Sequence, residues 1–583
     1  MGRRDLLFIV VCIAGLLALI ARIAPHTQSR DAELAAAGQL VAHHSPAKNA
    51  TDAPGLGLAP EEAAAVAAVD DVFRRHWQHI SVEPAPVADK LAIARRLSLA
   101  LTGTIPSLED VRSLESLPTA TRLAWWREQL LGQRRTADYL AERLARPLVG
   151  VEDGPFLIFR RRRFVTWLAD ALAENRPYDT VVRELIATNG LWTDQPATNF
   201  VTAAWLVDEK RIDVNRLASR VSRAFLGTRI DCAECHDHPF DRWTQDDFRG
   251  LADFFADTRQ GAVGIYDRTT TKKERSTKAP PDQARSEAKA TIKPSVPFAA
   301  DLLPEQGAPR ARLAAWVTDP RNKPLSRVTV NRLWGVVFGR PLVEPIDSIP
   351  LPDVGATGAP TESGAQPASE VLELLADDFA RHGFDIRRTL RILASLEVFQ
   401  LDSRTHVPAD ATEVDDSEPD SSPIAGWSVF PLTRLRSEQL AYSIAQTSSL
   451  ETIDSQSSAL MIFVRFVGHQ QFVKRFGDAG EAELSPGVGT IPQQLLLLNG
   501  KSVHEATKGV NPINASWRVA ALAPDDERAV EAAYLVVLSR RPTPDERAHF
   551  VARLQDRSGD KRHLAVEDLF WTLLNSTEFA WNH

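Results

Sequence analysis

The sequence contains little cysteine, methionine or tyrosine: 3 Cys, 2 Met and 5 Tyr occur among 583 residues. Three cysteines cannot build the dense disulfide framework of a small secreted domain, so a hydrophobic core must hold the fold together. Basic charge is not in excess, because the formal net charge is −8. A nucleic-acid-binding protein usually shows the opposite balance, so we predict no nucleic-acid partner. Beyond residue 24, no apolar run is long enough to cross a membrane.

The composition is that of a large globular protein. Hydrophobic residues make up 44% and charged residues 25% of the chain, which excludes collagen-like and wholly disordered classes. Apolar residues recur at helical spacing through most of the chain after residue 60, for example in 88–101 and 326–338. Strand signals are sparse. The sequence therefore predicts a mainly α fold.

Particular residues predict where helices begin and end. Gly103 is expected to end one helix, and Ser107 to begin the next as an N-cap, with Asp110 completing a capping box. Thr244 and Asp247 form the same kind of pair further along the chain.

Two stretches interrupt the helical pattern. Residues 259–297 are polar and rich in Lys, Thr and Pro, and residues 350–367 form a Gly, Pro and Ala loop. We therefore expect two helical domains, at 61–258 and 311–583, joined by an irregular linker or large loop at 259–310.

The N-terminus has the pattern of a membrane anchor. A basic patch at residues 2–4 precedes an apolar run at residues 6–21, and a helix extended to Ala24 would be about 28 Å long, close to the thickness of a bilayer core. A cleaved signal peptide is the alternative. Cleavage after Ala24 would place Arg22 three residues before the cut, so we favour an uncleaved membrane-anchor helix over residues 1–25.

The charge next to this run predicts the orientation of the protein. Arg3 and Arg4 are expected to stay on the cytoplasmic side. The sequence therefore predicts a single-pass protein of the cell membrane, with its body in the periplasm or another extracytoplasmic space. Residues 26–60 are rich in Ala, Gly, His and Pro without apolar periodicity, which predicts a flexible tether.

One motif carries recognisable chemistry. Residues 232–236 read CAECH, and C-x-x-C-H in an exported protein is the attachment pattern of haem c. Cys232 and Cys235 would bind the two vinyl groups, and His236 would be the proximal ligand of the iron. A sixth ligand is hard to find, since Met461 is the only methionine besides Met1.

The same residues allow three other interpretations. Cys232, Cys235, His236 and His238 could supply ligands to zinc or a similar metal. The two cysteines could instead form a disulfide in an oxidising compartment. In the third interpretation they are ordinary small residues and no cofactor is bound.

A second polar cluster lies in the predicted second domain. Arg327, Asn331 and Arg332 could hold an anionic or sugar ligand, and Trp334 could stack on a sugar ring. An Arg–carboxylate network that ties a helix to its loop is the interpretation we favour. No Ser-His-Asp order, P-loop or H-E-x-x-H motif is present, so we predict no catalytic residue and favour a non-enzymatic role.

Longer runs give the chain a family resemblance. They include ARRLSLALTGTIPSLEDV at 94–111, RAFLGTRIDCAECHDHPFDRW at 223–243, SRVTVNRLWGVVFGRPLVEPIDSI at 326–349 and LVVLSRRPTPDE at 535–546. The chain resembles the planctomycete proteins that pair DUF1549, also called planctomycete cytochrome c-like domain 2, with DUF1553, planctomycete domain 1. It departs from the usual pattern at residues 368–370, which read ASE where relatives show His-Pro-Glu, and at Phe399-Gln400, where Tyr-Arg-Gln is usual.

The resemblance implies an exported protein with a cytochrome-like role, and relatives are associated with the breakdown of complex polysaccharides. Our leading hypothesis is a membrane-tethered extracytoplasmic protein that binds haem c and passes electrons to a redox partner. The alternative is a non-redox binding or scaffold protein whose Cys/His cluster holds a metal or a disulfide, with polysaccharide-processing proteins as partners.

Overall fold

The structure is a computed structural model. It describes residues 27–42, 57–152, 159–239, 241–268, 293–350, 367–404, 426–453, 472–473, 475–477, 490–509 and 511–583. The described residues are 62% helix and 4% strand, which confirms the mainly α prediction. The predicted membrane anchor at 1–25 lies outside them. Within the described ranges, none of the helices combines the length and the apolar character needed to cross a membrane.

The first half of the chain is a succession of short helices. In chain order they are α2 (Thr27–Ala42), α3 (Pro60–His79), α4 (Lys90–Thr102), α5 (Leu108–Glu115), α6 (Arg122–Gly132), α7 (Arg134–Val149), α8 (Arg161–Ala173), α9 (Tyr178–Ala187), η1 (Pro196–Thr198), α10 (Asn199–Thr202), α11 (Val214–Val221), the π-helix η2 (Ser222–Leu226), η3 (Asp231–Glu234) and α12 (Gln245–Asp253).

The second half continues in the same manner. Its helices are η4 (Ala300–Leu302), α14 (Pro309–Val317), α15 (Pro324–Phe338), α16 (Pro367–Arg381), α17 (Ile386–Leu393), α18 (Glu397–Gln400), α19 (Ser437–Thr447), α21 (Ile491–Asn499), α22 (Lys501–Thr507), α23 (Ala515–Leu522), α24 (Asp526–Leu538), α25 (Pro544–Leu554), α26 (Gly559–Leu574) and η6 (Glu578–Ala580).

The described strands pair as antiparallel two-stranded ribbons. These are β1 (Trp205–Leu206) with β2 (Arg211–Ile212), β3 (Thr258–Gly261) with β4 (Gly264–Asp267), and β5 (Thr433–Arg434) with β6 (Trp581–Asn582). The last ribbon joins residues far apart in the sequence, so it fastens the C-terminal segment to the segment that precedes α19.

The predicted helix boundaries follow from capping. Gly103 ends α4 in the left-handed conformation. The Ser107 hydroxyl accepts from the backbone N–H of Asp110, whose carboxylate accepts from the N–H of Ser107. Thr244 and Asp247 make the same reciprocal pair at the start of α12. These three predictions are confirmed.

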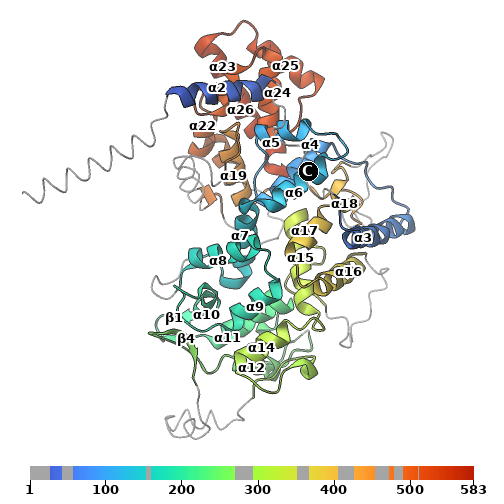
Figure 1. The fold of residues 1–583 in the computed structure, drawn as a ribbon, viewed down its shortest axis with the longest axis vertical. Helices are drawn as coiled ribbons and strands as arrows, with labels where there is room; N and C mark the ends of the chain where they lie inside the picture. The colour runs from blue at the N-terminus through green and yellow to red at the C-terminus, as the bar shows by residue number, and fades with distance from the viewer. Residues whose placement is uncertain are drawn as a thin grey trace, which may run out of the picture.

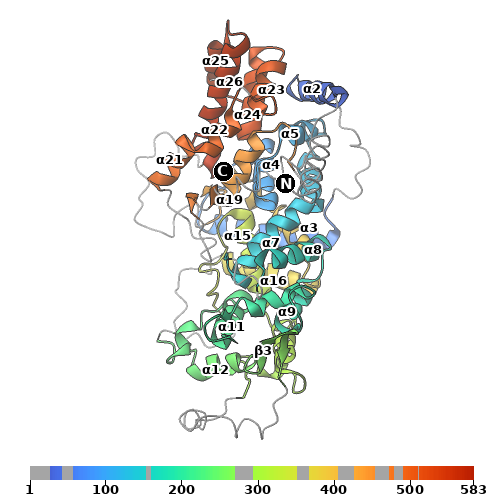
Figure 2. The same ribbon diagram turned by 90° about the vertical axis from the view of Figure 1, so that its left-hand side faces the viewer.

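The two halves of the chain interleave. Figures 1 and 2 show an elongated molecule with α23 to α26 at one end and α11 and α12 at the other. In the middle, α3 packs on α16 and α17, and α15 packs on α4 and η2. Buried apolar residues of both halves form one continuous core. The segments 61–258 and 311–583 therefore share an interior, and their division into two domains stays a prediction.

The predicted tether at 26–60 also differs in the structure. Thr27–Ala42 forms helix α2, which packs against α23 and α24. Its buried residues are Ala37, Leu40 and Val41. Most apolar residues of this segment are alanines and only Leu34, Leu40 and Val41 are large, so their spacing alone does not predict a helix. Contacts with α23 and α24 supply the burial that stabilises it.

Two consecutive arginines on α4 lie in the interior, each 1% exposed. Arg95 donates to the carbonyl oxygens of Val537 and Phe579, at 3.1 and 3.2 Å. Arg96 donates to the carbonyl oxygens of His583 and of Phe399 and Leu401 in and after α18. Since buried charges need hydrogen-bond partners, these guanidinium groups fix α4 against segments from the far end of the sequence.

Candidate functional site

The CAECH motif occupies a turn between η2 and α12. Gly227 ends η2 with a φ of 60°, and a Cβ there would come within 3.2 Å of the Val328 side chain on α15. The Gly227 carbonyl also accepts from the N–H of Ile349 at 2.8 Å. A glycine is needed here because the chain must turn in the left-handed region while touching a helix of the second half.

The motif itself is wrapped on η3 and presents its reactive groups to solvent. Ala233 is fully buried and anchors the turn. Cys232 and Cys235 are exposed, free thiols, and His236 is exposed as well. The His236 Nδ1 lies 2.7 Å from the carbonyl oxygen of Asp237. Since a carbonyl oxygen can only accept, Nδ1 is the donor in this contact, and Nε2 is the ring nitrogen that this contact does not use.

The first turn of α12 holds the motif in shape. The Gln245 side-chain amide donates to the carbonyl oxygens of Glu234 and Cys235, at 3.1 and 2.8 Å. The backbone N–H of Gln245 donates to the Asp237 carboxylate at 2.8 Å. The N–H of His238 donates to the carbonyl oxygen of Trp243. The turn is therefore ordered by hydrogen bonds that do not use the two thiols or the Nε2 atom of His236.

The alternative interpretations of the motif are a metal site and a disulfide. Among the described residues, no three His, Cys, Asp or Glu side chains converge as ligands for a metal ion. Cys232, Cys235, His236 and His238 are thus not gathered around a common point, and a zinc site at these residues stays a prediction. The two cysteines are free and unbridged in the structure.

The residues of the predicted ligand cluster on α15 have different roles: Trp334 lies in the core, and Asn331 holds the loop that follows the helix. Trp334 is fully buried and stacks on Phe338, with ring centroids 4.2 Å apart. It therefore cannot stack on a sugar, and that prediction was wrong: helical spacing does not reveal that α15 is buried on every face. Asn331, also fully buried, accepts from the N–H groups of Leu342 and Val343 at 2.9 and 3.0 Å and so holds the following loop.

The two arginines of the cluster have different surroundings. Arg327 pairs with Glu373 of α16 at 2.6 Å and donates to the carbonyl of Pro350 at 2.7 Å, so it ties α15 to a neighbouring helix. Arg332 points away from these partners and donates to the carbonyl oxygen of Ala224 in η2 at 3.0 Å. The four residues thus do not act as one site.

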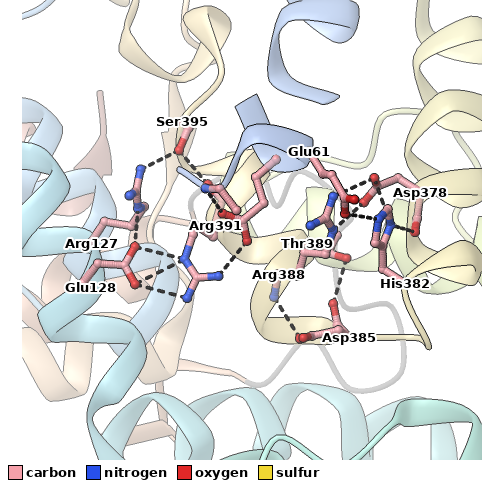
Figure 3. Close-up of polar contacts among 12 residues, drawn as sticks. Glu61, Arg127, Glu128, Asp378, His382, Asp385, Arg388, Thr389, Arg391 and Ser395 are labelled. Atoms are coloured by element: carbon pink, nitrogen blue, oxygen red, sulfur yellow. Dashed lines mark hydrogen bonds and ion pairs between the residues drawn. The ribbon is translucent and has the colours of Figure 1, made fainter. Parts of the chain in front are cut away.

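A larger polar network lies where α3, α6, α16 and α17 meet (Figure 3). Arg388 binds both carboxylate oxygens of Asp378, at 2.9 and 3.0 Å, and the ring of His382 lies between Asp378 and Glu61. Arg391 reaches both Glu128 and Glu62. Sequence reasoning missed this network because its members are spread over more than 300 positions, and no local spacing connects them.

The charges of this network are paired, and the pairing lowers the pKa of Glu128. Burial alone would raise the pKa of Glu128, but hydrogen bonds from Arg391 and Arg127 outweigh burial and hold the pKa below its ordinary value. Each carboxylate shown in Figure 3 faces a cation or a donor. The network therefore joins the N-terminal helix α3 to the second half of the chain.

The fold and the exposed turn define a helical protein with a free C-x-x-C-H motif. Family models match two segments: PSCyt2, a protein of unknown function (DUF1549), at residues 68–260, and PSD1, a protein of unknown function (DUF1553), at residues 309–554. The chain belongs to the family of proteins that combine these two domains. No curated protein and no solved structure matches the chain.

Proposed function

We propose that this protein binds haem c, with Cys232 and Cys235 as the attachment thiols and His236 as the proximal ligand, and that it transfers electrons outside the cytoplasm. The observation that carries the proposal is the contact between His236 Nδ1 and the Asp237 carbonyl, at 2.7 Å. A metal-binding histidine typically donates its other ring N–H to such an acceptor, which orients the ring and raises the basicity of Nε2.

The state of the thiols supports the same proposal. Both are free and exposed, and the turn that carries them is held by Gln245 rather than by the cysteines themselves. Haem, when bound, supplies a one-electron couple at its iron. The chain's own contribution is to present two thiols and one imidazole together on an ordered turn at one end of the molecule (Figure 1).

The position of the turn suits exchange with a redox partner. It lies beside α12, at the end of the molecule opposite α23 to α26. Together with the predicted anchor at 1–25, this supports a single-pass protein of the cell membrane with an extracytoplasmic body. The anchor would supply the membrane contact and the turn would meet the partner.

The test is a reduced-minus-oxidised absorption spectrum of the full chain, expressed in a host competent for cytochrome c maturation. We expect a haem band that persists on a denaturing gel and is lost in the Cys232→Ala/Cys235→Ala variant. Cys12→Ala is the matched control, since it removes the one cysteine outside the motif, and it should retain the band. Folded protein without covalent haem, beside a working control cytochrome, would overturn the proposal.

That negative result would favour the second candidate function. A non-redox binding or scaffold protein is supported by the extensive ion-pair network of Figure 3, which builds a rigid body without using the thiols. Its expected partners are polysaccharide-processing proteins, and co-purification of such partners with the folded, haem-free chain would be the corresponding test.

A further inference from the structure

A cavity of about 360 Å³ lies beside the CAECH turn, between the two segments that match the family models. Its first wall is α11 with η2, and its second is α15 with the loop at Ile346 and Asp347. The turn contributes Asp231 and Glu234. Neither cysteine of the motif lines the cavity, so the cavity is separate from the attachment thiols.

Arginines dominate the cavity wall formed by α11. Arg216, Ser219, Arg220 and Arg223 all line the cavity, and their spacing of three and four residues places them on one face of α11 and its continuation. Arg332 of α15 lines the cavity as well. Four guanidinium groups therefore border one small space.

The carboxylates of the cavity are already engaged. Asp347 pairs with Arg229, which lies outside the lining, at 2.7 Å, and Asp231 pairs with Arg223 at 2.8 Å. Two others accept from neutral donors: Glu234 accepts from the Asn215 side-chain amide at 3.0 Å, and Asp213 caps α11 through backbone N–H groups.

Two arginines of the cavity have no carboxylate partner among the described residues. Arg332 is 4% exposed, donates only to the backbone carbonyls of Ala224 and Arg223, and has no acceptor for its Nε–H. Arg216 is exposed at the same cavity and forms no ion pair with another described residue. A buried guanidinium without a counter-charge is costly, and an anion in the cavity would supply that charge.

We propose that this cavity is a binding site for a small oxyanion, a carboxylate or phosphate group, held between Arg216 of α11 and Arg332 of α15. Guanidinium groups bind such groups through paired, charge-assisted hydrogen bonds. Two ligands carry such a group. One is a free small anion, and the other is a haem bound at the neighbouring turn, through its carboxylate groups. The site does not depend on the haem proposal, because its residues are all present in the haem-free chain.

Isothermal titration calorimetry on the full chain in mild detergent tests the proposal, with malonate and inorganic phosphate as probes in a buffer without other oxyanions. We expect one-to-one binding of at least one probe. Arg216→Ala and Arg332→Lys should each weaken binding about tenfold or more, a change of about 1.4 kcal/mol. Arg404→Ala, an exposed arginine outside the cavity, is the matched control and should leave the affinity unchanged.

The outcomes separate the proposal from its rivals. Binding of malonate alone assigns a carboxylate, and binding of phosphate alone assigns a phosphate group. Titrations of the haem-free Cys232→Ala/Cys235→Ala chain and of the haem-loaded parent separate the two sources. Equal affinity of the two proteins for the probe indicates a free anion. Loss of probe binding in the haem-loaded parent alone indicates that haem carboxylates occupy the cavity. Absence of binding in the haem-free chain, or binding that Arg216→Ala leaves unchanged, would overturn the proposal. If Arg332→Lys fails to fold, the exposed Arg216→Ala variant decides.

Discussion

Glu438 is a buried carboxylate held between arginines of both halves of the chain. It is 4% exposed, and its Oε1 lies 2.5 Å from Arg143 of α7 and 3.2 Å from Arg436. Burial alone would raise the pKa of Glu438, but the arginine charges outweigh burial and lower it to about 2. The charge of Glu438 therefore contributes stability above its ordinary pKa, and that contribution is lost as the pH falls from about 4.5 toward 2.

Replacing Glu438 by Gln should therefore leave buried arginine charges uncompensated. We expect the free energy of unfolding at pH 7 to fall by about 3–5 kcal/mol, as measured by urea denaturation. Glu370→Gln removes an exposed pair with Arg75 and should cost less than about 1 kcal/mol. Equal losses in the two variants would contradict this account.

Asp70 on α3 shows the opposite shift. It is 7% exposed and accepts from the backbone N–H of Glu397. Burial raises the pKa of its carboxyl from 3.8 to about 6. Between these values the folded chain holds a proton that the unfolded chain has lost, so the contribution of Asp70 to stability declines as the pH rises through this window.

Asp70→Asn keeps the acceptor oxygen and removes the titration. We expect this variant to be more stable than the parent at pH 8 by roughly 1–3 kcal/mol and equally stable at pH 3. Thermal or urea unfolding across this pH range measures the difference. Asp71→Asn, at the neighbouring exposed position, should not change the pH profile; a gain at pH 8 in that control would show that the effect is not due to burial.

At the scale of elements, the join between η2 and α15 depends on Gly227. Its φ of 60° and the 3.2 Å approach to Val328 make any side chain there unfavourable. We expect Gly227→Ala to lower the free energy of unfolding by about 1–3 kcal/mol. Gly132→Ala, at the end of α6 where a Cβ meets nothing within 4 Å, should be neutral or slightly stabilising. Chemical denaturation of both variants provides the comparison, and an unaffected Gly227→Ala protein would contradict it.

The elements also show what sequence reasoning can predict. Capping by Ser107 and Thr244 and the stop at Gly103 were predictable because each is decided within four residues. The exposed state of the CAECH turn and the partners of His236 were not, because η3 and α12 meet through hydrogen bonds that apolar periodicity does not report. The burial of Trp334 was not predictable, because an aromatic residue near arginines shows the same sequence pattern whether it lies in a core or at a surface.

At the scale of the molecule, the interior depends on contacts over several hundred positions. Arg95 and Arg96 would be expected on the surface from residue type alone, yet both are buried with backbone partners at residues 399–401, 537 and 579–583. Composition and periodicity predicted the mainly α fold but not the packing of α4 against these distant segments. A buried arginine can be identified only from the carbonyl groups that accept its hydrogen bonds, and these lie far away in the sequence.

The shared interior leads to a prediction for the separate segments. Residues 61–258 expressed alone should lack a cooperative thermal transition, since the guanidinium groups of α4 would lose their partners on the second segment. The full chain should unfold in one transition that includes both halves. Circular dichroism of the two proteins measures this, and a sharp transition in the isolated segment would show that it folds independently.

The partners of Arg95 and Arg96 also set a time order for biogenesis. Their acceptors at Phe579 and His583 follow them by 484 and 487 positions. At a synthesis rate of about 5–20 residues per second, α4 leaves the ribosome roughly 25–100 s before those carbonyl groups exist. Throughout that interval Arg95 and Arg96 lack these two backbone acceptors, so the contacts that hold α4 against the C-terminal segment cannot yet form. For the extracytoplasmic location that we propose, this delay would leave the contacts between α4 and the C-terminal segment unformed while export begins.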